Sequence, residues 1–217
     1  MGFLLIDKPS GWTSFDVVNK IRGITKEKKV GHAGTLDPFA TGLLIILLGD
    51  YTKKQADFMK MDKTYEVEAF LGKNSSTGDP EGDIKDVSEA IPSIKAVNIA
   101  LGEFIGEQMQ TPPAYSAIKV SGKKAYELAR KGKPVVLKPR KINIYNITLV
   151  DYSYPELKFV CDVSSGTYIR SLVEDIGNKL GTVAYTKNLR RTKIGQYYLE
   201  DAIGVREVSS DIEHLYL

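Results

Sequence analysis

A glycine-rich loop holds the acidic residue of this chain that is best placed for chemistry. Residues 31–42 read Gly-His-Ala-Gly-Thr-Leu-Asp-Pro-Phe-Ala-Thr-Gly, with Asp37 near the centre. The glycines allow positive φ angles and close approach of a ligand, and Pro38 disfavours the right-handed helical region for Asp37. The unbroken apolar run 43–48 that follows is typical of a buried strand. The pattern therefore predicts a rigid strand that anchors an exposed carboxylate.

Local chemistry alone also allows a purely structural interpretation of this loop. In a turn, the Asp37 carboxylate can accept a hydrogen bond from a neighbouring backbone N–H, which is a common role for aspartate. The loop by itself leaves both interpretations open.

Four segments, in order along the chain, resemble the signature of one enzyme family. They are residues 8–14 (Lys-Pro-Ser-Gly-Trp-Thr-Ser), 31–44, 63–67 (Lys-Thr-Tyr-Glu-Val) and 165–171 (Ser-Gly-Thr-Tyr-Ile-Arg-Ser). Together they resemble the TruB family of tRNA pseudouridine synthases, and they extend over nearly the whole chain. Four ordered motifs with family-like separations favour a catalytic role for Asp37 over a turn cap.

The resemblance implies conversion of uridine to pseudouridine, in which the N1–C1′ bond breaks and C5 of the base joins the same sugar carbon. It assigns the attacking carboxylate to Asp37, with addition to base C6 or to sugar C1′ left open. Arg170 matches the family arginine that would keep this carboxylate ionised. Tyr65 matches the family tyrosine, either as a stacking wall or as a general base.

The resemblance also implies a target uridine in the T loop of tRNA, at position 55, that is flipped out of its stack before reaction. His32 matches the residue at the base-flipping position, and Tyr168 and Leu189 match residues that line the base pocket. The sequence departs from the family pattern at residues 50–53, where a small residue more commonly precedes Thr-Lys. This difference concerns local backbone detail and not the nucleophile.

Each of these candidates also has a structural alternative. Arg170 falls outside the apolar stripe of its predicted helix, where a surface pair with Glu174 would be worth roughly a few tenths of a kcal/mol. Tyr65 shares a predicted strand face with core residues, where aromatic side chains usually pack. A lone histidine such as His32 is more often structural.

Positive charge is concentrated in one segment. Residues 119–141 hold nine Lys or Arg and one acid, a local charge of +8, so the rest of the chain carries −5 of the total +3. Such a segment suits phosphate contacts, although a solvated helix face explains it equally well from charge alone. It resembles the family's RNA-gripping insertion, at about residues 112–141. The residues expected to contact phosphates are Lys8, Lys53, Lys119, Lys123, Lys124 and Arg130.

Composition is that of an ordinary globular protein in a reducing compartment. Hydrophobic residues make up 42% and charged residues 26%, and the single cysteine, Cys161, excludes an intramolecular disulfide. No apolar run approaches the roughly 18 residues of a membrane span, and no signal-peptide pattern begins the chain. Two histidines without metal-ligand spacing, and no nucleotide-binding glycine motif, predict catalysis without metal or cofactor. We expect a cytoplasmic monomer.

Hydrophobic periodicity predicts an α+β fold. Alternation indicates strands at 2–7, 65–71, 142–151 and 157–163, and helical spacing indicates helices at 13–24, 50–61, 93–101 and 169–180. The polar stretch 73–86 is expected to be a loop. We expect one catalytic domain over residues 1–217, with a mixed, largely antiparallel sheet flanked by helices and a protruding basic insertion. This fits the pseudouridine synthase fold that the resemblance implies, with the usual C-terminal RNA-binding domain of the PUA type absent or truncated.

Two other functions compete with the tRNA uridine isomerase. An RNA-binding or tRNA-folding protein, in which modification is secondary, needs the basic insertion but no carboxylate near phosphates. A glycoside hydrolase needs a second acid in a matching loop, and the sequence offers none. Analysis of the product formed from unmodified tRNA separates the three.

Overall fold

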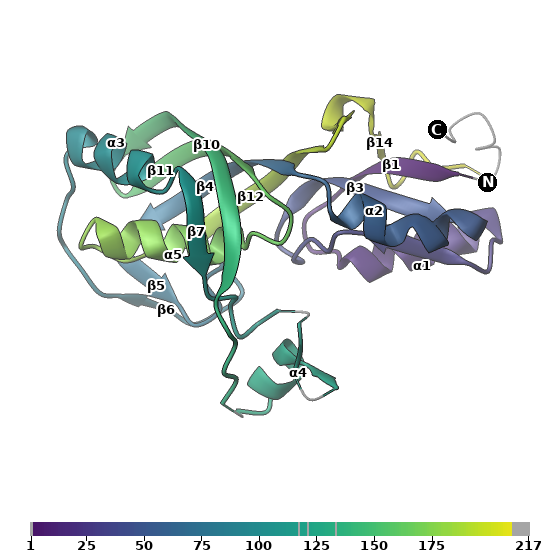
Figure 1. Ribbon diagram of the computed structural model, residues 1–217, viewed down its shortest axis with the longest axis horizontal. Helices are drawn as coiled ribbons and strands as arrows, with labels where there is room; N and C mark the ends of the chain where they lie inside the picture. Colours follow the sequence, from purple (N-terminus) through teal and green to yellow (C-terminus); the bar gives the residue numbers. More distant parts are fainter. Residues whose placement is uncertain (1, 117, 121, 133, 210–217) are drawn as a thin grey trace. The chain divides into compact units, whose positions relative to one another are not determined.

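The computed structural model describes residues 2–116, 118–120, 122–132 and 134–209 (Figure 1). The chain divides into a first compact unit, Met1–Glu66 with Leu189–Leu217, and a second compact unit, Val67–Asn188. Strands β4 (Lys63–Leu71) and β12 (Ala184–Ile194) each run from one unit into the other. Both units combine a sheet with helices, so the predicted α+β class is confirmed. The assignment of the whole chain to one catalytic domain stays a prediction.

The sheet of the first unit is organised around the apolar run that the sequence singled out. Residues 43–48 form most of β3, and their side chains are fully buried because both faces of the strand meet apolar neighbours. β1 and β2 pair with β3 in antiparallel fashion, whereas β12 runs parallel to it. The strands are β1 (Phe3–Lys8), β2 (Val30–Ala33), β3 (Thr41–Leu48), β13 (Tyr197–Tyr198) and β14 (Ile203–Gly204).

The first helix of this unit is capped by Thr13, the first residue of the helix expected at 13–24. The Thr13 hydroxyl accepts a hydrogen bond from the Asp16 backbone N–H, and the Asp16 carboxylate accepts one from the Thr13 N–H. The helix expected at 50–61 is divided into a 3-10 turn and a short α-helix, whose Phe58 packs on Phe3 with 5.2 Å between ring centroids. The helices are α1 (Ser14–Thr25), η1 (Gly49–Lys54), α2 (Gln55–Met59) and η2 (Leu199–Asp201).

The second unit is an antiparallel sheet with two longer helices. The predicted strand pair is confirmed, since β10 and β11 are antiparallel with Ile147 opposite the fully buried Cys161. The predicted helical stripe is also confirmed in α5, and α3 packs against β10 and α5.

No helix formed by the described residues combines the length and apolar character that a membrane span requires. The elements are β7 (Gly106–Gln110), β10 (Arg140–Ser153), β11 (Glu156–Val163), α3 (Ile94–Glu103) and α5 (Ile169–Lys179).

The polar stretch 73–86 is more ordered than the loop that its composition predicts. Its two ends pair as an antiparallel hairpin. The turn between them is closed by short polar side chains, because Ser75 Oγ donates to the Asp79 carbonyl at 2.5 Å and Thr77 Oγ1 donates to Asp79 Oδ1 at 2.5 Å. The two strands are β5 (Lys73–Ser75) and β6 (Ile84–Asp86).

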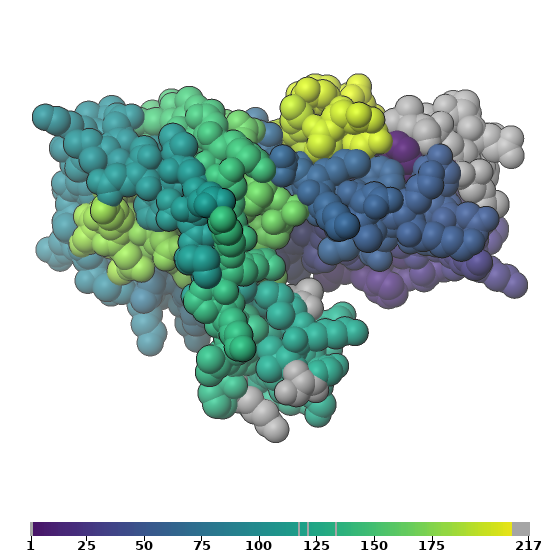
Figure 2. Space-filling model, in the orientation of Figure 1, coloured from purple at the N-terminus to yellow at the C-terminus, as the bar shows by residue number. Residues whose placement is uncertain are grey.

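The basic insertion lies between β7 and β10 of the second unit (Figure 1). It contains the short helix α4 (Ala125–Ala129), which follows a hairpin of β8 (Lys119–Val120) and β9 (Lys123–Lys124). Figure 2 shows the insertion, in teal and green, standing out from the rest of its unit. Its exposed side chains include Lys119, Lys123, Lys124 and Arg130.

Candidate active site

The loop that carries Asp37 joins β2 to β3 and is held as a compact turn. The Asp37 carbonyl accepts a hydrogen bond from the Ala40 N–H at 3.1 Å, and the Pro38 carbonyl accepts one from the Gly11 N–H at 2.9 Å. The Asp37 side chain is half-buried. Two backbone hydrogen bonds thus fix the loop around Asp37.

Lys8, which was expected to contact phosphates, is buried beside this loop. Its side chain has no exposed surface, and its ammonium donates to the carbonyls of Trp12 at 2.6 Å, Pro9 at 2.9 Å and Pro38 at 3.2 Å. These carbonyl dipoles compensate the cost of burying the charge. A phosphate has no access to this ammonium here, and the position of Lys8 suits it to fixing the Pro38 side of the loop.

Arg191 ties the two ends of the Asp37 loop together. The residue is 1% exposed, and its guanidinium donates from Nε to the Leu43 carbonyl at 2.8 Å and from Nη2 to the Gly34 carbonyl at 2.9 Å. Gly42, with φ +101°, allows this approach, because a Cβ there would lie 2.3 Å from the Arg191 carbonyl oxygen. Arg190 and Arg191 are adjacent in the sequence, and nothing local distinguishes the buried Arg191 from its neighbour.

Lys63 lies near Arg191 on the same side of the loop. A Cβ added to Gly34 would lie 3.4 Å from Arg191 Nη1 and 3.9 Å from Lys63 Cε. The Lys63 ammonium donates to the Met59 carbonyl at 2.9 Å and to the Met61 carbonyl. Burial, with a further contribution from the charge of Arg191, lowers the pKa of Lys63 to about 8. Two buried cations thus support the loop from one side.

We expect Lys63 to make the stability of the protein depend on alkaline pH. Its pKa is about 8 in the folded protein against an ordinary value of 10.5, so in this interval only the unfolded chain keeps the proton. The free energy of unfolding should rise by about 1.4 kcal/mol per pH unit between about pH 8 and 10, relative to Lys63→Met. Urea unfolding of both proteins across this interval measures the difference. Parallel pH curves would contradict the lowered pKa.

The other candidates of the first unit lie on its strands. Tyr65 on β4 and Leu189 on β12 are each 7% exposed. The expectation that Tyr65 shares a strand face with core residues is confirmed, because burial alternates along β4. His32 on β2 is half-buried, and its carbonyl accepts a hydrogen bond from Gln55 Nε2 at 2.7 Å. The roles assigned to these side chains stay predictions.

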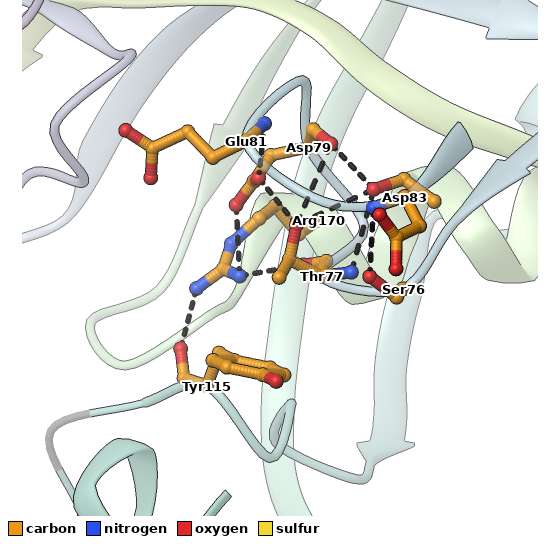
Figure 3. A network of polar contacts seen from close by, with 8 residues as sticks. Ser76, Thr77, Asp79, Glu81, Asp83, Tyr115 and Arg170 are labelled. Carbon is orange, nitrogen blue, oxygen red and sulfur yellow. Dashed lines mark hydrogen bonds and ion pairs between the residues drawn. The ribbon is translucent and has the colours of Figure 1, made fainter. Parts of the chain in front are cut away.

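Arg170 is buried in the second unit at the centre of a polar network (Figure 3). Its Nη1 donates to the Thr77 carbonyl at 2.7 Å and pairs with Asp79 Oδ2 at 3.1 Å, and its Nη2 donates to the Tyr115 carbonyl at 2.7 Å. The alternative of a surface pair with Glu174 is therefore wrong. Burial raises the pKa of the Glu174 carboxyl, and the charge of Arg170 opposes that rise.

Asp79 is a partner of Arg170 that sequence reasoning missed. It is 3% exposed, and its Oδ1 accepts hydrogen bonds from Thr77 Oγ1 at 2.5 Å and from the Glu81 N–H at 3.0 Å. Its Oδ2 remains for Arg170, as Figure 3 shows. Because both carboxylate oxygens have fixed partners, the guanidinium is held in one orientation. In the sequence this position is marked by a Thr-Gly-Asp run inside a polar stretch, which is a weak signal for a buried ion pair.

Tyr168 is held through its backbone and is covered by Arg140. Gln110, which is 3% exposed, accepts from the Tyr168 N–H at 2.8 Å and donates to the Tyr168 carbonyl at 3.0 Å. The Arg140 guanidinium carbon lies 4.7 Å from the centroid of the Tyr168 ring, a cation–π contact. Sequence reasoning singled out neither supporting residue, because both are far from Tyr168 along the chain.

The remaining phosphate-binding candidates are exposed cations. In the insertion, Lys124 and Arg130 flank the Tyr126 ring at 5.5 Å and 5.6 Å from its centroid. In the first unit, Lys53 forms a surface pair with Asp50 at 2.8 Å. Such side chains are accessible to an RNA backbone. The exposed set is Lys53, Lys119, Lys123, Lys124 and Arg130.

Comparison with family models places this chain in one class of enzyme, the pseudouridylate synthases. Residues 22–169 match the model described as TruB family pseudouridylate synthase (N terminal domain). Residues 170–214 match the model described as tRNA pseudouridylate synthase B C-terminal domain. The chain belongs to the TruB family.

Individual relatives agree with this assignment. The tRNA pseudouridine synthase B of Aquifex aeolicus (strain VF5) is 46% identical over 211 residues, which cover 96% of this chain and 74% of that protein. The tRNA pseudouridine synthase B of Protochlamydia amoebophila (strain UWE25) is 45% identical over 208 residues, which cover 95% and 79%.

Solved structures confirm the expected pseudouridine synthase fold. A chain in the crystal structure of a Cbf5-Nop10-Gar1 complex is similar with a TM-score of 0.73 and 30% identity. A chain in the structure of an H/ACA RNP bound to a substrate RNA containing 2′-deoxyuridine gives 0.70 and 28%. Each similarity covers 95% of this chain, which spans about half of the solved chains, 53% and 51%.

Proposed function

We propose that this protein converts uridine 55 in the T loop of tRNA into pseudouridine, with Asp37 as the nucleophile. The observation that carries the proposal is the Asp37 loop, whose ends are tied by the buried Arg191 and whose Pro38 carbonyl is held by Lys8. Membership of the TruB family supports the reaction class, and relatives named tRNA pseudouridine synthase B support the substrate.

The proposed reaction is an isomerisation that consumes no second substrate. The Asp37 carboxylate adds to C6 of the uracil or to C1′ of the ribose, and the N1–C1′ bond breaks. The base turns, a C5–C1′ bond forms, C5 loses its proton, N1 gains one, and the carboxylate is released unchanged. Both points of attack lead to the same product.

Arg170 and Tyr65 take complementary roles in this proposal. A guanidinium stays protonated at physiological pH and presents a planar fork, which suits it to keeping the nucleophilic carboxylate ionised. Asp79 fixes the orientation of that fork. The buried Tyr65 ring offers an apolar face for the uracil and a hydroxyl for the C5 proton.

Flipping of the target base is assigned to His32, with Tyr168 and Leu189 lining the pocket that receives the base. We expect His32→Ala to slow the reaction on folded tRNA about tenfold more than on an oligonucleotide whose target base is already unstacked, because extrusion costs a few kcal/mol only where stacking must be broken. Single-turnover rates on both substrates measure this, with His32→Phe as the control that keeps a flat ring. Equal losses on both substrates would argue against the flipping role.

The insertion is assigned to the RNA backbone. Neutralising Lys123, Lys124, Arg130 and Lys131 together should weaken binding and reduce the slope of log affinity against log salt by about three units, since each of the four lost phosphate contacts removes somewhat under one unit. Filter binding over a salt series measures the slope. An unchanged slope would show that these side chains are solvated and do not contact phosphates. The matched control neutralises four lysines of the first unit, Lys20, Lys26, Lys28 and Lys29.

The direct test of function is product mapping. Purified protein is incubated with an unmodified tRNA transcript in the absence of added metal, and pseudouridine is located by carbodiimide modification. We expect one modified position, the T-loop uridine 55. No product there would contradict the proposal.

A second candidate function, assistance of tRNA folding, is favoured by the exposed cations of the insertion. Binding and remodelling of RNA do not require the Asp37 carboxylate. If folding assistance coexists with catalysis, Asp37→Asn will still accelerate tRNA folding while forming no pseudouridine. Equal rates of tRNA folding in the presence and in the absence of the Asp37→Asn protein would exclude this second function.

A further inference from the structure

Arg191 joins the two ends of the loop that carries Asp37. The loop follows β2, which ends at Ala33, and leads into β3. The Arg191 guanidinium donates to the Gly34 carbonyl, before Asp37, and to the Leu43 carbonyl, after it. All of these residues belong to the first unit. One buried planar group therefore holds the loop backbone on both sides of the carboxylate.

The backbone of β12 fixes the place from which this guanidinium acts. Arg191 lies opposite Gly42 where β12 and β3 run in parallel. An added Cβ on Gly42 would lie 2.3 Å from the Arg191 carbonyl oxygen and 2.8 Å from its backbone nitrogen. The two strands thus approach more closely at this point than a larger residue allows. Since the Arg191 backbone is held in a sheet, its side chain can impose a fixed position on the loop.

The contacts of Arg191 depend on the shape of a guanidinium as well as on its charge. Two N–H groups of one rigid plane reach two carbonyls that are well separated along the chain. The third nitrogen, Nη1, faces Gly34, where an added Cβ would lie 3.4 Å away. A lysine ammonium has the same charge, but its single nitrogen cannot replace this planar fork.

Two neighbouring cations differ from Arg191 in what they hold. Arg190, one residue earlier on β12, is partly exposed and pairs with the Asp7 carboxylate. Lys63 donates to backbone carbonyls at the end of α2. Of these three cations, Arg191 is the one that bonds to the backbone on both sides of Asp37.

We infer that Arg191 is a positioning residue for the isomerisation, whose two hydrogen bonds fix the direction in which the Asp37 carboxylate attacks. In this role Arg191 acts through the loop backbone. A displacement of about 1 Å in a reacting group costs on the order of a hundredfold in rate. Loss of the two bonds should therefore slow the chemical step and leave tRNA affinity nearly unchanged. The inference rests on the proposed function of Asp37.

The first test compares Arg191→Lys with Arg190→Lys, the same change at the adjacent residue. The fraction of each preparation that binds tRNA is determined by stoichiometric titration, and single-turnover rates are expressed per binding-competent protein. Arg191→Lys should react about a hundredfold more slowly than the wild type, with a Kd for tRNA within about twofold. Arg190→Lys should lose little activity. A defect in folding alone would lower the binding-competent fraction and not the rate per competent protein.

The second test restores the missing group from solution. Arg191→Gly removes the whole side chain. Guanidinium ion, at concentrations well below those that denature the protein, should raise the rate of this variant at least about tenfold. Ammonium ion at the same ionic strength supplies the charge without the plane and should have no effect.

The third test leaves Arg191 in place. Gly34→Ala adds a methyl group against Nη1 at a residue with φ +91°, so it should displace the same end of the loop. Its rate per competent protein should fall at least about tenfold, with an unchanged Kd. Gly23→Ala on α1, where an added Cβ meets nothing within 4 Å, is the matched control and should keep the wild-type rate.

Three results would overturn the inference: a wild-type rate per competent protein in Arg191→Lys, an equal loss in Arg190→Lys, or equal stimulation of Arg191→Gly by guanidinium and ammonium. If neither Arg191 variant folds, an undiminished rate in Gly34→Ala overturns it. The wild type is assayed for pseudouridine on the same tRNA. Product from the wild type and from an equally active Arg191→Lys contradicts the positioning role alone. No product from the wild type contradicts the proposed function and with it the inference.

Discussion

Asp37→Asn should abolish pseudouridine formation while leaving RNA affinity within about twofold of the wild type. The amide has the shape of the carboxylate but neither its charge nor its nucleophilicity, so the covalent step is lost and the backbone turn around Pro38 remains. We expect kcat to fall by on the order of a thousandfold or more, which corresponds to about 4 kcal/mol of barrier. Single-turnover product formation and filter binding on the same preparation separate the two effects.

A matched control for this variant is Asp86→Asn, which removes an exposed carboxylate that pairs with Lys73 at the surface. It should keep full activity. A rate for Asp37→Asn as high as a tenth of the wild type would exclude Asp37 as the nucleophile, because that factor is only about 1.4 kcal/mol.

Arg170→Lys should lower kcat by at least about a hundredfold, or ~2.7 kcal/mol, despite the conserved charge. The guanidinium uses two nitrogens to reach the Thr77 carbonyl, Asp79 and the Tyr115 carbonyl. A single ammonium nitrogen on a flexible side chain cannot hydrogen-bond to all three of these acceptors at once. The variant also leaves part of a buried polar network unsatisfied, so its thermal unfolding must be measured beside its rate.

Arg190→Lys is the control for Arg170→Lys, since Arg190 makes a similar fork with Asp7 at 2.8 Å and 3.3 Å but is partly exposed. It should lose little activity. A folded Arg170→Lys protein with a near-normal rate would show that the fork geometry is dispensable.

Local signals predicted the elements that position the site. The apolar run 43–48 forms most of β3, the helical spacing at 13–24 corresponds to α1, and the spacing from 169 to 180 corresponds to α5. Each of these depends on residues close together in the sequence, where alternation, helical period and capping act directly. The expected position of Tyr65 on a buried strand face followed from the same alternation.

Local sequence patterns do not predict polar contacts between residues that are far apart along the chain. Asp79 lies 91 residues from Arg170, and the polar composition of its stretch predicts only a loop, whereas the structure shows that the stretch supplies a buried ion pair. The expectation that Lys8 contacts phosphates is wrong because its ammonium is buried and donates to the Pro38 carbonyl, 30 residues away. Arg191 reaches Leu43 across 148 residues. Charge type is visible in a sequence, whereas the carbonyls that compensate a buried charge are not.

The central claim is that this chain isomerises one tRNA uridine through Asp37, and release of the C5 hydrogen tests it most directly. A tRNA transcript carrying tritium at C5 of its uridines is mixed with excess enzyme, and tritium released to water is counted over time. The wild type should release one tritium per tRNA, and Asp37→Asn should release none. No release by the folded wild type, or equal release by both proteins, would contradict the assignment.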